Sequence, residues 1–321
     1  MTESRKDSAP ERIEQLDFAD TAAAVAKLLE VPPESALDLR ALNDALSGAF
    51  NQDLPDVGAV HEDVAINDHL RTDVVVPDGS GPFPVLLYVH GGAWVAGGPR
   101  HYAKLSRRFA EAGFLTFVVD YRLAPEHPFP AGWQDCVDAA RWVARECGRW
   151  GGDASRLAIG GDSAGANLSA AVVPALASSE VNLKAIVLIY GAFDFEMMLN
   201  RPAHSEVDER LNLANRIAAE AYLGDDIEKL VVDPRVSPVH DISGMPPAHI
   251  VVGAEDALVP QSEALVRKLE AARVEHEYFC DPHMPHGYLQ MEMLPPSAPA
   301  LARIVAFLTR HLALGEGRQG R

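Results

Sequence analysis

One short stretch, residues 159–167 (Ile-Gly-Gly-Asp-Ser-Ala-Gly-Ala-Asn), restricts the fold of this chain more than any other. The run at residues 156–159 before it, apolar after Arg156, predicts a buried strand, and the small, mostly apolar residues 168–173 after it favour a helix. Glycines two positions before and after Ser163 permit a sharp turn where a Cβ atom would clash with the neighbouring strand and helix. The pattern is typical of a nucleophile elbow, with Ser163 at a helix N-terminus that favours a developing negative charge.

Apolar strands alternate with helices from Pro84 onward, and this alternation predicts the fold class. Strands are expected at residues 85–89, 114–119, 157–159, 185–190, 249–252 and 275–279, helices at 102–112, 133–147, 262–272 and 299–311, and a hairpin at 60–66 and 70–76. Short strands without polar alternation are buried on both faces. The sequence therefore predicts an α/β fold whose mostly parallel central sheet carries helices on both faces.

The length of 321 residues fits one large α/β domain with insertions or two modest domains. Residues 1–55 are helical in pattern, contain no strand, and are expected to pack on the main domain as cap helices. Residues 193–238 interrupt the alternation of strands and helices with charges, prolines and one helical run. We therefore expect a cap insertion at 193–238, a core formed by 56–192 and 239–314, and a polar tail at 315–321.

The acidic balance of the chain argues against two classes of partner. The formal net charge of −18 at pH 7 disfavours binding to nucleic-acid phosphates and to anionic membranes. No apolar run approaches the roughly 20 residues of a transmembrane helix, so no membrane insertion is expected.

Two further features concern the location of the protein. Residues 1–7 are polar and lack the apolar core of a signal peptide. Three scattered cysteines, Cys136, Cys147 and Cys280, predict buried, reduced thiols, and we expect a cytoplasmic protein.

A glycine-rich loop, residues 90–94 (His-Gly-Gly-Ala-Trp), directly follows the first predicted parallel strand. An oxyanion hole needs backbone N–H groups that approach a substrate carbonyl closely. The amides of Gly92 and Ala93, with that of Ala164 just after Ser163, are the predicted donors, and Gly91 is predicted to supply the turn. We expect a negative φ at Ala93, because a positive φ would cost an alanine roughly 1 kcal/mol.

Two late loops contain the candidate acid and base, in the order serine, acid, histidine. Glu255 and Asp256 follow the strand at 249–252, and by position either could accept a hydrogen bond from an imidazole. After the last strand come His283 and His286. His286 is favoured because Gly287 frees the loop around it.

These features resemble the hormone-sensitive-lipase-like esterases, a family of the α/β-hydrolase superfamily that carries His-Gly-Gly-Gly and Gly-Asp-Ser-Ala-Gly. Three segments carry the resemblance, namely residues 90–94, 161–165 and 120–131 (Asp-Tyr-Arg-Leu-Ala-Pro-Glu-His-Pro-Phe-Pro-Ala). The third segment is long and specific to this group. The resemblance extends over nearly the whole chain, including Tyr222-Leu223.

The resemblance implies an α/β-hydrolase fold with a helical cap and a serine carboxylesterase that works through an acyl-enzyme. It implies Ser163 as nucleophile, Asp256 as acid and His286 as base. No histidine or cysteine cluster has ligand spacing, so neither a metal nor a cofactor is expected. Charges in residues 193–238, in place of an apolar lid, favour short-to-medium acyl esters over triglycerides. Members of the family often dimerise through the last strand, so a homodimer is one expected assembly.

The sequence departs from the family pattern at two places, and the first is expected to affect the choice of substrate. Ala93 replaces the third glycine of the loop, and its methyl group is expected to narrow the alcohol side of the pocket, so that esters of tertiary alcohols are poor substrates. Residues 256–260 (Asp-Ala-Leu-Val-Pro) replace the usual Asp-Pro-Leu and charged pair. Two alternative functions stay open: an arylformamidase-like amidase, suggested by residues 90–94 and 258–260, and a non-catalytic ligand-binding relative.

Overall fold

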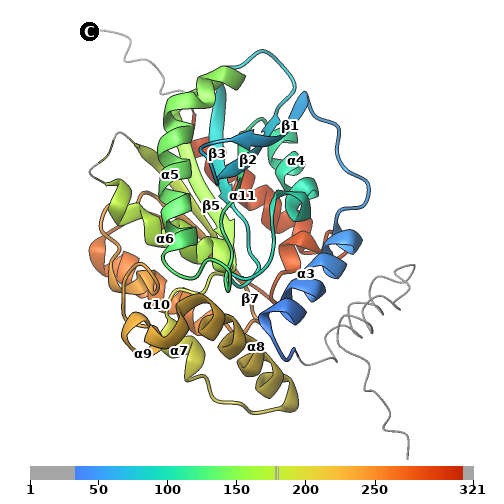
Figure 1. Ribbon diagram of the computed structural model, residues 1–321. Coiled ribbons are helices and arrows are strands. Elements are labelled where there is room, and N and C mark those ends of the chain that lie inside the picture. The colour runs from blue at the N-terminus through green and yellow to red at the C-terminus, as the bar shows by residue number, and fades with distance from the viewer. Residues whose placement is uncertain (1–32, 178, 180, 314–321) are drawn as a thin grey trace, which may run out of the picture.

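A computed structural model describes residues 33–177, 179 and 181–313. Eight strands form one sheet in the order β1-β2-β4-β3-β5-β6-β7-β8 (Figure 1). The strands are β1 (Ala59–Ala65), β2 (Arg71–Val76), β3 (Phe83–Val89), β4 (Leu115–Asp120), β5 (Gly152–Asp162), β6 (Leu183–Ile189), β7 (Ala248–Gly253) and β8 (His276–Asp281). Helices predicted within residues 1–32, and the tail at 315–321, lie outside the described residues.

The predicted hairpin and the mostly parallel sheet are confirmed. Strands β1 and β2 pair antiparallel, β2 pairs antiparallel with β4, and every neighbouring pair from β4 to β8 is parallel. Because parallel strands carry their carboxyl ends at one edge of a sheet, the loops after β3, β5, β7 and β8 meet there. These four loops, together with Ala164 at the start of the helix after β5, contain all the predicted site residues.

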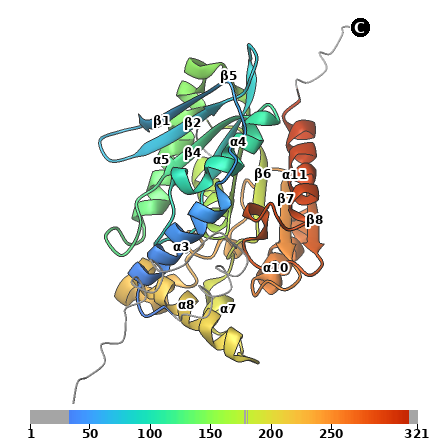
Figure 2. The same ribbon diagram turned by 90° about the vertical axis from the view of Figure 1, so that its right-hand side faces the viewer.

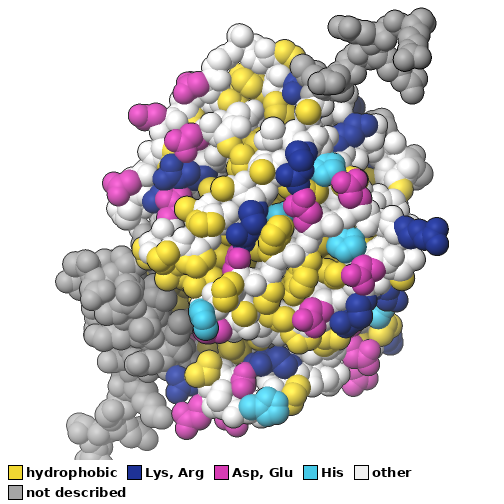
Figure 3. All heavy atoms as spheres, turned by 180° about the vertical axis from the view of Figure 1, so that it is seen from behind, with side chains coloured by type: hydrophobic (Ala, Val, Ile, Leu, Met, Phe, Trp, Pro, Cys, Tyr) yellow, Lys and Arg dark blue, Asp and Glu magenta, His cyan; other side chains and the backbone are white. Residues whose placement is uncertain are grey.

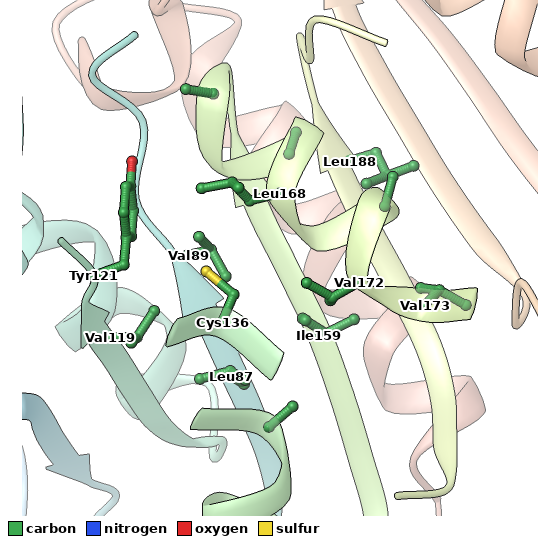
Figure 4. Close-up of a cluster of buried hydrophobic side chains, with 14 of the residues drawn as sticks. Leu87, Val89, Val119, Tyr121, Cys136, Ile159, Leu168, Val172, Val173 and Leu188 are labelled. Atoms are coloured by element: carbon green, nitrogen blue, oxygen red, sulfur yellow. The ribbon is translucent and has the colours of Figure 1, made fainter. Parts of the chain in front are cut away.

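Five helices cover the two faces of the sheet, as predicted. They are α4 (Ala103–Glu111), α5 (Ala131–Glu146), α6 (Ala164–Leu176), α10 (Val259–Ala272) and α11 (Ser297–His311). Side chains of β3 alternate between the faces: Leu87 and Val89 pack with α5 and α6, whereas Leu86 and Tyr88 pack with α4 and α11. Figure 4 shows the first of these clusters, in which Leu168 of α6 lies beside Val89 and Val172 of α6 lies beside Ile159.

Four further helices lie together at one end of the sheet (Figures 1 and 2). They are α3 (Ala36–Phe50), α7 (Phe195–Leu199), α8 (Glu206–Leu223) and α9 (Ile227–Leu230). The side chains of Ser35 and Ser205 accept hydrogen bonds from first-turn amides and thereby begin α3 and α8. Helix α3 contacts α8 although the two are far apart in sequence.

The prediction that all three cysteines are buried is wrong for one of them. Cys136 and Cys147 are buried, but Cys280 is exposed. Cys280 lies on β8, the edge strand of the sheet, where a side chain has neighbours from one adjoining strand only. On the face seen in Figure 3, charged side chains of both signs are interspersed with apolar ones. Within the described residues, no helix is both long enough and apolar enough to span a bilayer.

Candidate active site

Ser163 lies at a strained turn between β5 and α6. Its φ and ψ are 52° and −119°, a region that non-glycine residues occupy only when the surroundings enforce it. The Ser163 N–H donates to the carbonyl of Ile189 at 2.8 Å. A Cβ atom at Gly161 or at Gly165 would overlap the carbonyl oxygen of Val89. The two glycines are therefore required by strand β3, which passes directly beneath the turn.

The structure brings Ser163, His286 and Asp256 together. His286 Nε2 lies 2.9 Å from Ser163 Oγ, and His286 Nδ1 lies 2.7 Å from Asp256 Oδ2. Asp256 follows β7, is only 6% exposed, and accepts a further hydrogen bond from the Leu258 amide at 2.8 Å. With the proton on Nδ1 shared with Asp256, Nε2 faces the serine hydroxyl as an acceptor.

The alternative acid and base pair with each other and not with Ser163. His283 Nδ1 lies 3.6 Å from Glu255 Oε1, and the two side chains are 88% and 62% exposed. Adjacent residues in the turn after β7 direct their side chains differently, so only Asp256 reaches His286. The structure thus separates Asp256 from Glu255, which sequence position alone left open, and places His286, which the sequence favoured, beside Asp256.

The surroundings of His286 shift its pKa upward. Partial burial lowers the pKa, but the charge and the hydrogen bond of Asp256, together with the charge of Asp162, outweigh it, so the net pKa lies above 6.5. The ring of Tyr190 contacts the imidazole edge-to-face at 5.0 Å between centroids. Tyr190 itself has a φ of 38°. This packing fixes the orientation of the His286 ring.

The glycine-rich loop turns through three consecutive positive φ values, and this corrects one prediction. Gly92 has a φ of 124°, Ala93 of 53° and Trp94 of 61°. The expected negative φ at Ala93 is wrong, because the loop must reverse direction there so that the amides of Val95 and Ala96 reach the Gly92 carbonyl at 3.1 and 2.8 Å. Within the described residues, the amides of Gly92, Ala93 and Ala164 donate to no protein acceptor.

Gly91 differs from these three residues, because its amide is already engaged. It donates to Tyr102 Oη at 2.9 Å and to Asp162 Oδ1 at 3.0 Å. A Cβ atom at Gly91 would lie 2.6 Å from Asp162 Oδ2. Gly91 therefore anchors the loop and leaves the available amides to its neighbours. Asp162 and Tyr102 are site residues that were not predicted from the sequence, although Asp162 lies inside the elbow motif.

Segment 120–131 supports the base of the same loop. The ring of Tyr121 stacks on that of His90 at 4.2 Å, and its hydroxyl donates to the His90 carbonyl at 3.0 Å. Burial lowers the pKa of His90 to about 4, so its ring is neutral at neutral pH. Arg40 of α3 donates to the Val95 carbonyl at 2.9 Å and forms an ion pair with Glu126 at 2.8 Å. These contacts give the motif a physical role in holding residues 90–95.

A parallel sheet with helices on both faces, a serine at a strained strand-to-helix turn, and a histidine–carboxylate pair from later loops define the class of α/β hydrolases. The model of the alpha/beta hydrolase fold family matches residues 86–290. The carboxylesterase NlhH of Mycobacterium tuberculosis is 33% identical over 316 residues, which cover 95% of this chain and 93% of that protein.

Solved structures give the same result. The hyperthermophilic esterase of the archaeon Pyrobaculum calidifontis superposes with a TM-score of 0.81 at 26% identity, over 91% of this chain and 97% of that one. An esterase of the bacterial hormone-sensitive lipase family superposes with a TM-score of 0.76 at 29% identity, over 96% and 100%. The chain belongs to the α/β-hydrolase family, in its hormone-sensitive-lipase group of carboxylic-ester hydrolases.

Proposed function

We propose that this enzyme is a serine carboxylesterase that hydrolyses short-to-medium acyl esters through an acyl-enzyme, with Ser163, His286 and Asp256 as catalytic residues. The observation that carries the proposal is the continuous hydrogen-bonded series from Ser163 Oγ through His286 to Asp256, at 2.9 and 2.7 Å. Such a series activates a hydroxyl that is a weak nucleophile on its own.

In the acylation half, His286 Nε2 takes the proton of Ser163 as Oγ attacks the ester carbonyl carbon. Asp256 holds the imidazole in the required tautomer and stabilises the imidazolium that forms. The amides of Gly92, Ala93 and Ala164 are the proposed donors to the oxyanion. His286 then gives its proton to the leaving alcohol, and the acyl group stays on Ser163.

In the deacylation half, His286 takes a proton from water as the water oxygen attacks the acyl carbonyl. A second tetrahedral intermediate uses the same three amides, and its collapse returns the proton to Ser163 and releases the acid. Every proton transfer in the cycle passes through His286 Nε2, and the chain and water supply all the groups used.

We also propose the division of the chain into a cap, formed by residues 193–238 and by the described part, 33–55, of the predicted segment 1–55, and a core at 56–192 and 239–314. The contact of α3 with α8 and the packing of Phe195 and Tyr222 against Trp94 support this division. Helix α8 begins with the charged residues Glu206, Asp208 and Glu209, which suits small, partly polar esters better than a lipid droplet.

Two proposals concern the enzyme in the cell. We infer a cytoplasmic location from the three scattered cysteines, which form no disulfide, and fractionation of the native host would test it. A homodimer through β8 is supported by the position of this strand at the sheet edge, where its outer backbone groups have no strand partner among the described residues. Light scattering of the purified protein would give the mass.

The experiment that tests the function is hydrolysis of p-nitrophenyl butyrate by the wild type, Ser163→Ala and His286→Ala, with a mass scan after a serine-directed phosphonate. We expect both variants to lose roughly 10³-fold or more in kcat/KM, and the phosphonate adduct to map to Ser163. His283→Ala is the matched control, because it removes an exposed histidine three positions earlier in the same loop, and it should retain wild-type activity.

Three outcomes would change the proposal. Full activity in Ser163→Ala would overturn the assignment of the nucleophile. An esterase with a flat acyl-chain profile from acetate to laurate would overturn the preference for short-to-medium chains. A wild type that takes up phosphonate at Ser163 yet hydrolyses a formanilide faster than the matched aryl ester would establish the amidase in place of the esterase.

A further inference from the structure

The carboxylate of Asp162 is a buried junction between the loops that surround Ser163. Asp162 is 2% exposed. Its Oδ1 accepts hydrogen bonds from Tyr88 Oη at 2.9 Å and from the Gly91 amide at 3.0 Å. Its Oδ2 accepts one from Tyr102 Oη at 2.8 Å and a longer one from Gln290 Nε2 at 3.4 Å.

The four donors come from four separate parts of the fold. Tyr88 lies on β3 and Gly91 in the glycine-rich loop, Tyr102 closes a short 3-10 helix (Pro99–Tyr102), and Gln290 lies in another (Tyr288–Gln290) just after His286. Asp162 itself precedes the nucleophile. A single carboxylate therefore connects the segments that contain Ser163, the available amides and His286.

We propose that Asp162 is a positioning residue for hydrolysis, holding the glycine-rich loop through the Gly91 amide and maintaining a negative charge toward His286. The proposal rests on the proposed function of Ser163 and His286. Gly91 precedes Gly92 directly, so a loop released at Gly91 would no longer hold the next two amides where an oxyanion forms. Preorganised donors are effective only while they stay fixed.

The charge of Asp162 acts on His286 through space. Burial raises the pKa of Asp162 above its ordinary value, and the hydrogen bonds from Tyr102, Tyr88 and the Gly91 amide, which stabilise the ionised form, offset part of this increase. The ionised form in turn raises the pKa of His286, in addition to the larger contribution of Asp256. The other titratable groups close to this carboxylate are tyrosines, whose own pKa values burial raises: Tyr88, Tyr102, Tyr121 and Tyr190.

Three variants separate the two effects, each assayed with p-nitrophenyl butyrate over a pH range. Asp162→Asn keeps an oxygen for the Gly91 amide and removes the charge. The acidic limb of the pH profile, the low-pH range in which kcat/KM falls as His286 is protonated, should therefore move to lower pH by roughly half a unit.

Tyr102→Phe keeps the charge of Asp162 and removes one hydrogen-bond partner of the Gly91 amide. We therefore expect kcat to fall at nearly constant KM while the acidic limb stays at the same pH. Asp162→Ala removes both, and kcat should fall roughly 10²-fold.

Asp135→Asn is the matched control. Asp135 is also a fully buried carboxylate, but its partners are Arg122 and His69. This control should lose stability without any movement of the acidic limb. It therefore distinguishes a general loss of packing from a specific effect on His286.

The proposal is overturned if the acidic limb of Asp162→Asn coincides with that of the wild type, or if Tyr102→Phe and Asp162→Ala keep kcat within roughly threefold of it. Should Asp162→Ala fail to fold, the other two variants decide. Failure of the proposed function is distinct, because an active Ser163→Ala or an inactive wild type would reveal it in the same assay, whatever the Asp162 variants do.

Discussion

The indole nitrogen of Trp94 donates a hydrogen bond to the side-chain oxygen of Asn167 at 3.2 Å. Trp94 ends the glycine-rich loop and Asn167 lies in the first turn of α6, so this bond joins the loop to the helix that follows Ser163. The side-chain nitrogen of Asn167, Nδ2, donates to the backbone carbonyls of Ala192 and Val236, both at 2.7 Å. One buried side chain thus links the loop, the elbow and both ends of the insertion at 193–238.

Replacement of Asn167 by Asp should destabilise the enzyme strongly. The aspartate keeps the shape but loses both donors and leaves two buried carbonyls without a partner, which costs about 2–5 kcal/mol of unfolding free energy. Urea unfolding measures the loss. Asn200→Asp, at the exposed end of α7, should stay within about 0.5 kcal/mol of the wild type. Equal midpoints for the two variants would show that the Asn167 bonds contribute nothing.

The pH dependence of activity should follow the raised pKa of His286. The base must be neutral to accept the proton of Ser163, so activity is lost as pH falls through this pKa. Because the pKa of His286 lies above the ordinary 6.5, kcat/KM should begin to fall at a pH above 6.5 and should then decrease about tenfold for each further unit of pH. A pH–rate profile measures it. A limb well below 6.5 would contradict the influence of Asp256 and Asp162.

Substitution of Ala93 by Gly should change selectivity. The φ of 53° strains an alanine by about 1 kcal/mol, and glycine removes both that strain and the methyl group. We expect the wild type to hydrolyse an n-butyl ester far better than the tert-butyl ester, and Ala93→Gly to narrow the difference. Comparison of kcat/KM for the two esters tests this. Equal turnover of both by the wild type would contradict the idea that the methyl group narrows the pocket.

The elbow should not tolerate a side chain at Gly165. A Cβ atom there would overlap the Val89 carbonyl and lie 2.5 Å from the His90 oxygen. Since both obstacles are backbone atoms, Gly165→Ala should lose about 3 kcal/mol or more. Gly148→Ala is the control, because no atom beyond its own neighbours along the chain lies within 4 Å of its Cβ position. Thermal unfolding compares them, and similar midpoints would refute the argument.

The local elements could be predicted well from the sequence, because strands and helices are set by periodicity over a few residues. The hairpin at 60–76, the parallel strands and the covering helices appear close to the predicted bounds, except that β5 runs over Gly152–Asp162 and not only over the predicted 157–159. The burial of Cys280 was predicted wrongly, since an edge position depends on the order of strands. That order is a property of the whole sheet.

The sequence by itself determined which chemical groups are available: a serine between two glycines, a glycine-rich loop after a strand, and acids and histidines in late loops. Tertiary structure decided how they are used. Ser163 and His286 lie 123 positions apart, and folding brings Asp256 to His286. Folding also gives Ala93 its positive φ and directs Tyr88, Tyr102 and Gly91 to Asp162. Local sterics act between neighbours along the chain, whereas hydrogen-bond partners and strand order depend on which distant segments the fold brings into contact.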